Sequence, residues 1–267
     1  MQVRRALVRK VDHFYIPYEN AETVFSFLTQ VLALPVAWPY KDYGSISSGG
    51  VGLGNVNLEI LRSSTLVDSF VAHRPARIQG IAFEPEPVDE EFLADLDSRG
   101  IVHSPPSPFE CTLGSFTGLL FTTVFFADFI SESAAAFVCQ YHLPEITNQG
   151  ARRAALDAVG GGVLGIESCK EFIIGSPDTE AAASRWQRLF DPIKPRQFGE
   201  WQIGEGPTIR IVRSRHEAIE RVVLRVRSLD QAQVALDRIG VVTMQEAGEL
   251  RVVAEPLEGL DLRLVTG

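Results

Sequence analysis

The chain has 267 residues, of which 45% are hydrophobic and 22% charged, the balance of a globular protein with enough apolar material for two cores. Its net charge of -9 and its pI of about 5.1 argue against nucleic acid or an anionic membrane surface as a partner. Three cysteines, Cys111, Cys139 and Cys169, have no CxxC spacing, which disfavours a disulfide framework and fits a reducing cytoplasm. No continuous apolar stretch follows the basic N-terminus, so we expect no signal peptide.

The first part of the chain predicts a strand, a helix and several further strands. Alternating apolar residues predict a strand over 9–17, and helical spacing predicts a helix over 20–34, capped by Asn20. Further strands are expected at 36–40, 43–47, 50–53 and 56–61, with a turn at Gly49-Gly50. This order is β, α, β, β, β.

The same order is expected three more times. The second copy has strands at 76–85, 119–130 and 134–142, a helix at 88–100 and a loop or edge segment at 103–109. A short helix and three glycines fill 148–162. The third copy has strands at 165–176, 198–206 and 207–214 and a helix at 178–190 capped by Asp178; the fourth has strands at 219–228, 249–256 and 260–266 and a helix at 229–240. Residues 11–32 align with 169–190 without a gap, which indicates an internal repeat of about half the chain.

Two side chains of the first unit suggest chemistry. His13 lies in the first strand, VDHFYIP, and Glu59 in the last, VNLEIL. A mid-strand carboxylate flanked by apolar residues is costly without a partner. The alternative interpretations are ordinary ones: a satisfied histidine at a strand end, and a Glu59 paired with Arg62 or Arg77.

This pattern resembles the first module of the vicinal-oxygen-chelate superfamily, which includes glyoxalase I, the extradiol dioxygenases and the bleomycin resistance proteins. The resemblance implies an α+β fold of four βαβββ modules, paired into two glyoxalase-like domains with curved mixed sheets. We expect an N-terminal domain over 1–147 (modules 9–66 and 76–145), a linker over 148–162 and a C-terminal domain over 163–267 (modules 163–214 and 217–267).

In that superfamily metal ligands come from the first and last strand of each module. The resemblance therefore implies a divalent metal (Zn, Ni, Mn or Fe) at His13 and Glu59, with Glu59 also the catalytic residue; a site without metal is the alternative. In the second module Gly80 takes the place of a ligand, and Gln140, which is aligned with Glu59, is the expected third metal ligand. Replacements for the missing ligand are nearby at His142 and Glu145.

The second pair of modules has no metal-ligand set. Its corresponding positions are Glu171, Arg210, Arg221 and Arg263. Three arginines repel a cation, so we predict a Glu171–Arg210 ion pair and a structural role for this half; anion binding is the alternative.

Two functions remain. The first is a metal-dependent lyase or isomerase acting on a small oxygen-rich molecule; dioxygenation is disfavoured because Gly80 removes the expected second histidine. The second is a metal-free protein that binds or sequesters a small molecule. Either way the expected partner is a small-molecule ligand, contacted by Tyr15, Trp38, Phe125 and His142. A homodimer, and pairing of modules between chains, stay open.

Overall fold

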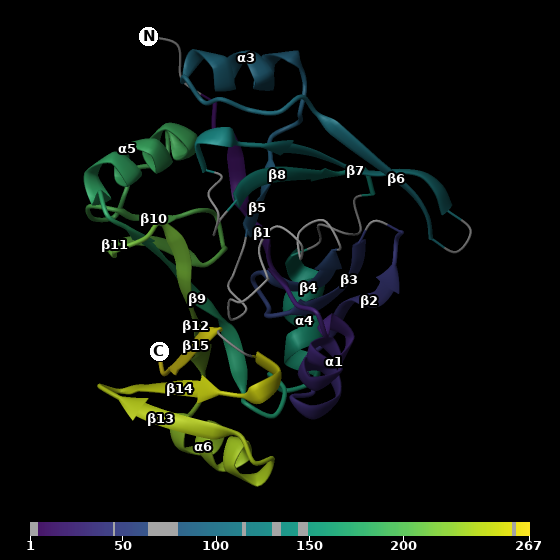
Figure 1. Cartoon of the computed structure of the whole chain (residues 1–267), viewed down its shortest axis with the longest axis vertical. Helices are drawn as coiled ribbons and strands as arrows, with labels where there is room; N and C mark the ends of the chain where they lie inside the picture. Colours follow the sequence, from purple (N-terminus) through teal and green to yellow (C-terminus); the bar gives the residue numbers. More distant parts are fainter. Residues whose placement is uncertain are drawn as a thin grey trace.

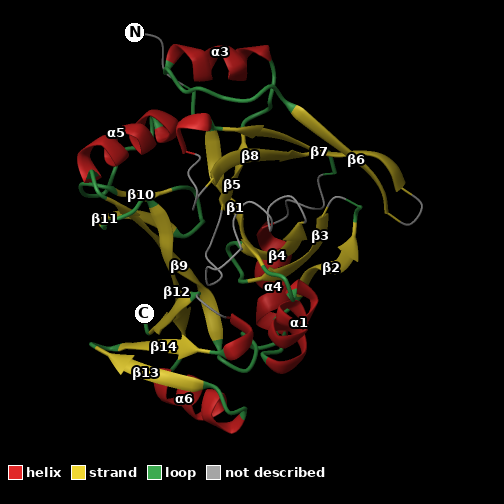
Figure 2. Ribbon diagram, in the orientation of Figure 1, coloured by secondary structure: helices red, strands yellow, loops and turns green. Residues whose placement is uncertain are grey.

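The computed structural model describes residues 5–44, 46–63, 80–113, 116–129, 135–143, 149–257 and 260–267. These residues form two curled mixed sheets, one of eight strands and one of seven (Figure 1). Strands predominate over helices (Figure 2). The fold is therefore α+β, as predicted, and each sheet consists of strands from one chain.

The eight-stranded sheet has the order β2-β3-β4-β1-β5-β8-β7-β6. Its strands are β1 (Val8–Pro17), β2 (Val36–Asp42), β3 (Ile46–Gly52), β4 (Asn57–Ser63), β5 (Gly80–Pro85), β6 (Ser107–Leu113), β7 (Phe116–Phe125) and β8 (Ala135–Tyr141). Its helices are α1 (Ala21–Ser26), which continues as a π-helical turn over Phe27–Val31, and α3 (Glu90–Ser98). The segment predicted as a loop or edge contributes β6, which lies at one edge of the sheet.

The seven-stranded sheet has the order β10-β11-β9-β12-β15-β14-β13. Its strands are β9 (Ile166–Ser176), β10 (Glu200–Gln202), β11 (Thr208–Arg213), β12 (Ala218–Val226), β13 (Val242–Glu246), β14 (Glu249–Val253) and β15 (Asp261–Val265). Helices α5 (Thr179–Phe190) and α6 (Leu229–Arg238) belong to it, and α4 (Gln149–Ala158) lies between the two sheets in sequence.

Both sheets are built around the same four-strand pattern. The first strands of the two modules pair antiparallel, β1 with β5 and β9 with β12. Each is flanked by the last strand of its own module in parallel: β4, β8, β11 and β15. The first and last strands of each module therefore lie side by side, which places their side chains close enough to act together.

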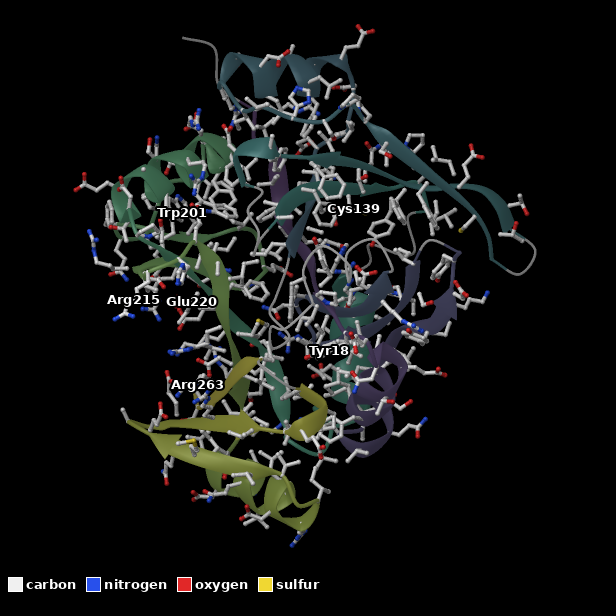
Figure 3. All side chains as sticks on the ribbon, in the orientation of Figure 1. Tyr18, Cys139, Trp201, Arg215, Glu220 and Arg263 are labelled. Atoms are coloured by element: carbon white, nitrogen blue, oxygen red, sulfur yellow. The ribbon has the colours of Figure 1, made fainter. Side chains whose placement is uncertain are left out.

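One continuous hydrophobic core joins the two sheets. Phe14 of β1 packs against Phe172 of β9, with ring centroids 4.7 Å apart. Phe83 of β5 packs against Phe190 of α5 at 5.6 Å. Trp201, which is 1% exposed, contacts the same Phe190 ring, and Figure 3 places it beside α5.

A smaller cluster lies on the opposite face of the eight-stranded sheet. We call it the inner-face cluster; its members are Tyr15, Leu61, Ala82, Phe121, Phe125, Phe137, Cys139 and Tyr141. Figure 3 labels one member, Cys139 of β8. The sheet is thus apolar on both faces, but only one face belongs to the shared core.

One of the two predicted helix N-caps is confirmed. The Asp178 carboxylate accepts hydrogen bonds from the backbone N–H groups of Glu180 and Ala181, so this predicted cap is confirmed. Asn20 makes no such bond, because its backbone (φ -99°, ψ 38°) lies outside the extended conformation that a capping side chain needs. None of the helices in the described ranges has the length and hydropathy needed to span a membrane.

The predicted turn at Gly49-Gly50 is wrong, because both glycines lie inside β3. A methyl group on Gly49 would lie 2.7 Å from Cδ2 of Phe25, and one on Gly50 would overlap the Trp38 ring. The glycines therefore allow aromatic rings to lie directly over the strand. For this reason one strand replaces the two predicted at 43–47 and 50–53.

We expect Gly50→Ala to lower the free energy of unfolding by about 1–3 kcal/mol, because the added methyl overpacks against Trp38. Urea unfolding measures this change. In a Trp38→Ala background the same substitution should cost almost nothing. An equal cost in both backgrounds would contradict the role assigned to the Trp38 ring.

Candidate functional site

His13 and Glu59 meet on the inner face of the eight-stranded sheet. His13 is 5% exposed, and its Nε2 lies 3.4 Å from Oε2 of Glu59 on the neighbouring β4. The parallel register places Tyr15 beside Glu59, so His13, two residues earlier, lies on the same face. The sequence-based prediction that these two residues face each other is in agreement with this geometry.

Asp12 holds the other side of the imidazole. Its Oδ2 lies 2.7 Å from Nδ1 of His13. The ladder between β1 and β5 is irregular between Val11 and His13, which frees Asp12 from the regular alternation of faces. Asp12 is completely buried.

Arg152 neutralises this buried carboxylate. Its Nη2 lies 2.5 Å from Asp12 Oδ1, and its Nη1 donates to the backbone oxygen of Asp12 at 3.1 Å. Burial alone would raise the pKa of Asp12, but the hydrogen bond from His13 and the charge of Arg152 hold it well below its ordinary value. Asp12 is therefore ionised and can only accept hydrogen bonds, so Nδ1 of His13 carries a proton.

Ser48 and Trp38 orient the carboxylate of Glu59. The Ser48 hydroxyl donates to Glu59 Oε1 at 2.5 Å and accepts from the indole N–H of Trp38 at 3.2 Å. Within the described residues Glu59 forms no ion pair with an arginine, Arg62 included; Arg77, the other predicted partner, lies outside the described residues. A continuous series of polar contacts, which we call the polar chain, runs through Trp38, Ser48, Glu59, His13, Asp12 and Arg152.

The polar chain determines what the pair His13–Glu59 can hold. With Nδ1 protonated, Nε2 faces a carboxylate oxygen, and this contact is favourable only if a positive charge lies between the two atoms. That charge is either a proton on Nε2 or a bound cation. Burial lowers the pKa of His13, but the hydrogen bond to Asp12 and the charges of Asp12 and Glu59 outweigh it, so the pKa is raised.

The second module offers no ligand opposite this pair. Ala82 pairs with Phe137 as Tyr15 pairs with Glu59, so Gly80 and Phe137 occupy the positions that correspond to His13 and Glu59. The expected gap at Gly80 is present. A methyl group there would overlap the Tyr15 ring, so the glycine makes room for that ring.

The prediction that Gln140 lies opposite Glu59 is wrong. Phe137 has that place, and a shift of three residues (137 to 140) reverses the face of the strand. The amide oxygen of Gln140 instead accepts from the backbone N–H of Val88 at 2.7 Å, ahead of α3. His142 shares the face of Gln140; it is exposed, and its Nε2 lies 2.9 Å from Oγ1 of Thr122. Neither side chain reaches His13.

The other predicted ligand-contacting residues do lie around the pair. The Trp38 and Phe137 rings meet the imidazole of His13 edge-on, with centroids 6.2 Å and 5.8 Å away. Phe125 stacks on Phe137 at 4.8 Å. Tyr15 also packs against Phe137, and burial raises the pKa of its hydroxyl. The replacement ligand Glu145 lies outside the described residues.

Within the described residues this donor set is incomplete for a resident metal ion. Catalytic metal sites use about three protein ligands. Within the described ranges, no three His, Cys, Asp or Glu side chains come together to hold a metal ion. The pair His13–Glu59 provides two donors, and the facing positions are a glycine and a phenylalanine ring.

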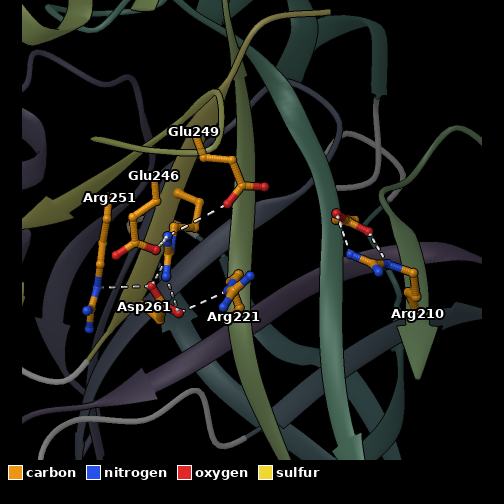
Figure 4. Close-up of polar contacts among 8 residues, drawn as sticks. Arg210, Arg221, Glu246, Glu249, Arg251 and Asp261 are labelled. Atoms are coloured by element: carbon orange, nitrogen blue, oxygen red, sulfur yellow. Dashed lines mark hydrogen bonds and ion pairs between the residues drawn. The ribbon is translucent and has the colours of Figure 1, made fainter. Parts of the chain in front are cut away.

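The corresponding place in the seven-stranded sheet is filled by ion pairs (Figure 4). Arg210 donates to both oxygens of Glu171, at 2.8 Å and 3.1 Å, so the predicted pair is confirmed. Arg263, which is 6% exposed, donates to Asp261 at 2.7 Å, and Arg221 donates to the same carboxylate at 2.9 Å. Because the charges neutralise one another, this half holds its strands together at the place where the first sheet has a candidate site.

Three members of the polar chain escaped sequence reasoning: Asp12, Ser48 and Arg152. Asp12 had a signal, since it is an acid inside an apolar strand and adjacent to the histidine. Arg152 had none, because it lies in the segment expected to be only a linker. Ser48 was one of several serines beside the misplaced turn.

Comparison with known proteins agrees with this architecture. No family model matches the chain, and no curated protein matches it. Among solved structures, a hypothetical protein from Staphylococcus aureus superposes with a TM-score of 0.63 and 12% identity, covering 97% of this chain and 99% of that one.

The chain therefore shares its fold with solved structures that include a glyoxalase and an extradiol dioxygenase. The Mn(II)-bound glyoxalase from Novosphingobium aromaticivorans superposes with a TM-score of 0.58 and 12% identity, over 97% of this chain and 82% of that one. Homoprotocatechuate 2,3-dioxygenase from Arthrobacter globiformis gives 0.58 and 10%, over 100% and 82%. At these identities the likeness shows the fold alone.

Proposed function

We propose that this protein binds a small, oxygen-rich molecule on the inner face of its eight-stranded sheet, without a resident metal. His13 and Glu59 are the hydrogen-bonding groups for the ligand's oxygens. The observation that carries the proposal is the asymmetry of the site: one module presents the polar pair, and the other presents Gly80 and the Phe137 ring. An apolar surface with a few convergent polar groups is the usual composition of a small-molecule site.

The ligand's apolar part would lie against the inner-face cluster. Phe125 and Phe137 are stacked there at 4.8 Å, and Phe109 and Phe121 at 4.7 Å. Its oxygens would take the place of the contact between Nε2 of His13 and Oε2 of Glu59. The proton held between these atoms supplies a donor, and Oε2 of Glu59, once the ligand separates it from His13, supplies an acceptor.

A divalent-metal-dependent lyase or isomerase is the second candidate. It is supported by the hydrogen bond from His13 to Asp12, because ligating histidines usually donate their other N–H to a carboxylate. The Mn(II)-bound glyoxalase among the structural neighbours supports it too. In this case the metal would be held by His13 and Glu59 and would polarise a substrate oxygen as a Lewis acid. A ring-cleaving dioxygenase is less well supported, because Gly80 stands where a second histidine would be needed.

Metal analysis separates the two candidates. Protein dialysed against EDTA is incubated with zinc, nickel, manganese or iron(II), desalted and analysed for bound metal. We expect far less than stoichiometric metal in the wild type. Stoichiometric metal that is lost in His13→Ala and Glu59→Ala, but kept in His216→Ala, would overturn the metal-free proposal in favour of the second candidate. His216 is an exposed histidine in the loop between β11 and β12 and serves as the matched control.

A thermal-shift screen tests binding itself. The panel contains small molecules with neighbouring oxygens, catechol and mandelate among them. A ligand at a hundred times its Kd stabilises the protein by about 2.7 kcal/mol. We expect at least one compound to raise the Tm of the wild type and of His216→Ala, with no shift in His13→Ala or Glu59→Ala. A shift that survives in both site variants would contradict the proposal.

A further inference from the structure

We propose that Arg152, in the helix between the two sheets, is a positioning residue for His13. It acts through Asp12 and touches neither His13 nor the expected ligand. This inference rests on the proposed function, since it concerns the same site, but its test does not require a ligand.

The two carboxylate oxygens of Asp12 contact different side chains. Oδ1 faces Arg152 and Oδ2 faces His13. Asp12 is fully buried, so water cannot replace either partner. The guanidinium also donates to the backbone oxygen of Asp12, so it fixes the strand and the side chain together.

The position of Arg152 in the chain makes this contact informative. Arg152 belongs to α4, which lies outside both pairs of modules, and it is 140 residues away from Asp12 in sequence. The side chain is 7% exposed, whereas the neighbouring Arg153 is exposed. The segment expected to serve only as a linker therefore delivers one buried arginine to the base of the site.

The consequence is a fixed imidazole. With Oδ1 held by Arg152, Oδ2 keeps its place beside Nδ1 of His13, and Nε2 keeps its direction toward Glu59. Without Arg152, the carboxylate can turn, and Nδ1 loses its defined acceptor. Nε2 would then no longer be aimed at the ligand.

A spectroscopic signature of His13 tests the proposal. A buried imidazole N–H that donates to a carboxylate exchanges slowly and gives a downfield resonance in the spectrum of ¹⁵N-histidine-labelled protein. Its loss in His13→Gln assigns it. We expect the signal to be present in the wild type and in Arg153→Met, lost in Arg152→Met, and displaced but present in Arg152→Lys, which keeps the charge but not the paired N–H groups.

An unmoved His13 signal in folded Arg152→Met would overturn the proposal and leave Arg152 as a purely structural ion-pair partner. Circular dichroism establishes whether that variant is folded. Should it not fold, Arg152→Lys alone decides: a displaced signal supports the proposal and an unmoved one overturns it. A failed ligand screen would not affect this result, so the two proposals fail separately.

Discussion

Replacing Arg152 by methionine lowers the free energy of unfolding by about 3–5 kcal/mol, the usual effect of removing one partner of a buried ion pair. The loss arises mainly from what remains. Asp12 stays fully buried with a charge that Arg152 no longer compensates, and desolvating an uncompensated carboxylate is costly. Urea denaturation followed by circular dichroism measures the change.

An exposed ion pair of the same chain provides the control. Arg9 and Glu86 lie 2.8 Å apart, but their side chains are 51% and 26% exposed. Arg9→Met should therefore cost less than about 1 kcal/mol. The double variant Asp12→Asn/Arg152→Met should recover part of the loss, because it removes the orphaned charge. An effect of Arg152→Met as small as that of Arg9→Met would show that the buried pair contributes little.

The pH dependence of the free energy of unfolding distinguishes the contributions of Asp12 and His13 in the wild type. The pKa of Asp12 is lowered on folding, so its contribution is present above about pH 4, its unfolded pKa, and is lost as the pH falls. The pKa of His13 is raised, so its contribution is present below about pH 6.5 and is lost as the pH rises through the folded value. In Arg152→Met the acid-side loss should be smaller, because Asp12 no longer has a strongly lowered pKa.

The sequence was sufficient for the parts of the fold that follow from local periodicity. Alternation along VDHFYIP and VNLEIL assigned His13 and Glu59 each to a face of its own strand, and the internal repeat of about half the chain predicted the Glu171–Arg210 pair. In both cases strand register fixes which side chains meet, and the register is the same in the two sheets.

Sequence reasoning failed where an apolar strand has no alternation to fix its register. Every residue of Ala135–Cys139 is apolar, so a shift of three residues left Gln140 on the wrong face. It failed again at Gly49-Gly50. Two consecutive glycines are typical of a turn, but here they leave room for the Phe25 and Trp38 rings over the strand. The contact of Arg152 with Asp12 spans 140 residues and has no local signal at all.

Phe14→Ala should lower the free energy of unfolding by about 3–5 kcal/mol, the range for a large aromatic side chain removed from a packed core. Phe14 is 1% exposed, and its ring packs at 4.7 Å against Phe172 of the other sheet. Val242→Ala is the control: this side chain is 63% exposed, and its loss should change stability by less than about 0.5 kcal/mol.

The same substitution tests whether the two sheets fold as one unit. Because a single core crosses from β1 to β9, unfolding of either sheet exposes apolar surface of the other, so both should unfold in one transition. Two single-tryptophan proteins report this separately, one that keeps Trp38 in the first sheet and one that keeps Trp201 in the second. Within each protein the urea midpoint from tryptophan fluorescence should coincide with the midpoint from far-UV circular dichroism, and both should fall together when Phe14→Ala is introduced. Separate midpoints would mean that the eight-stranded sheet, which carries the candidate site, is stable alone. Coincident midpoints would mean that the stability of the candidate site depends on the seven-stranded sheet, whose corresponding place is filled by ion pairs.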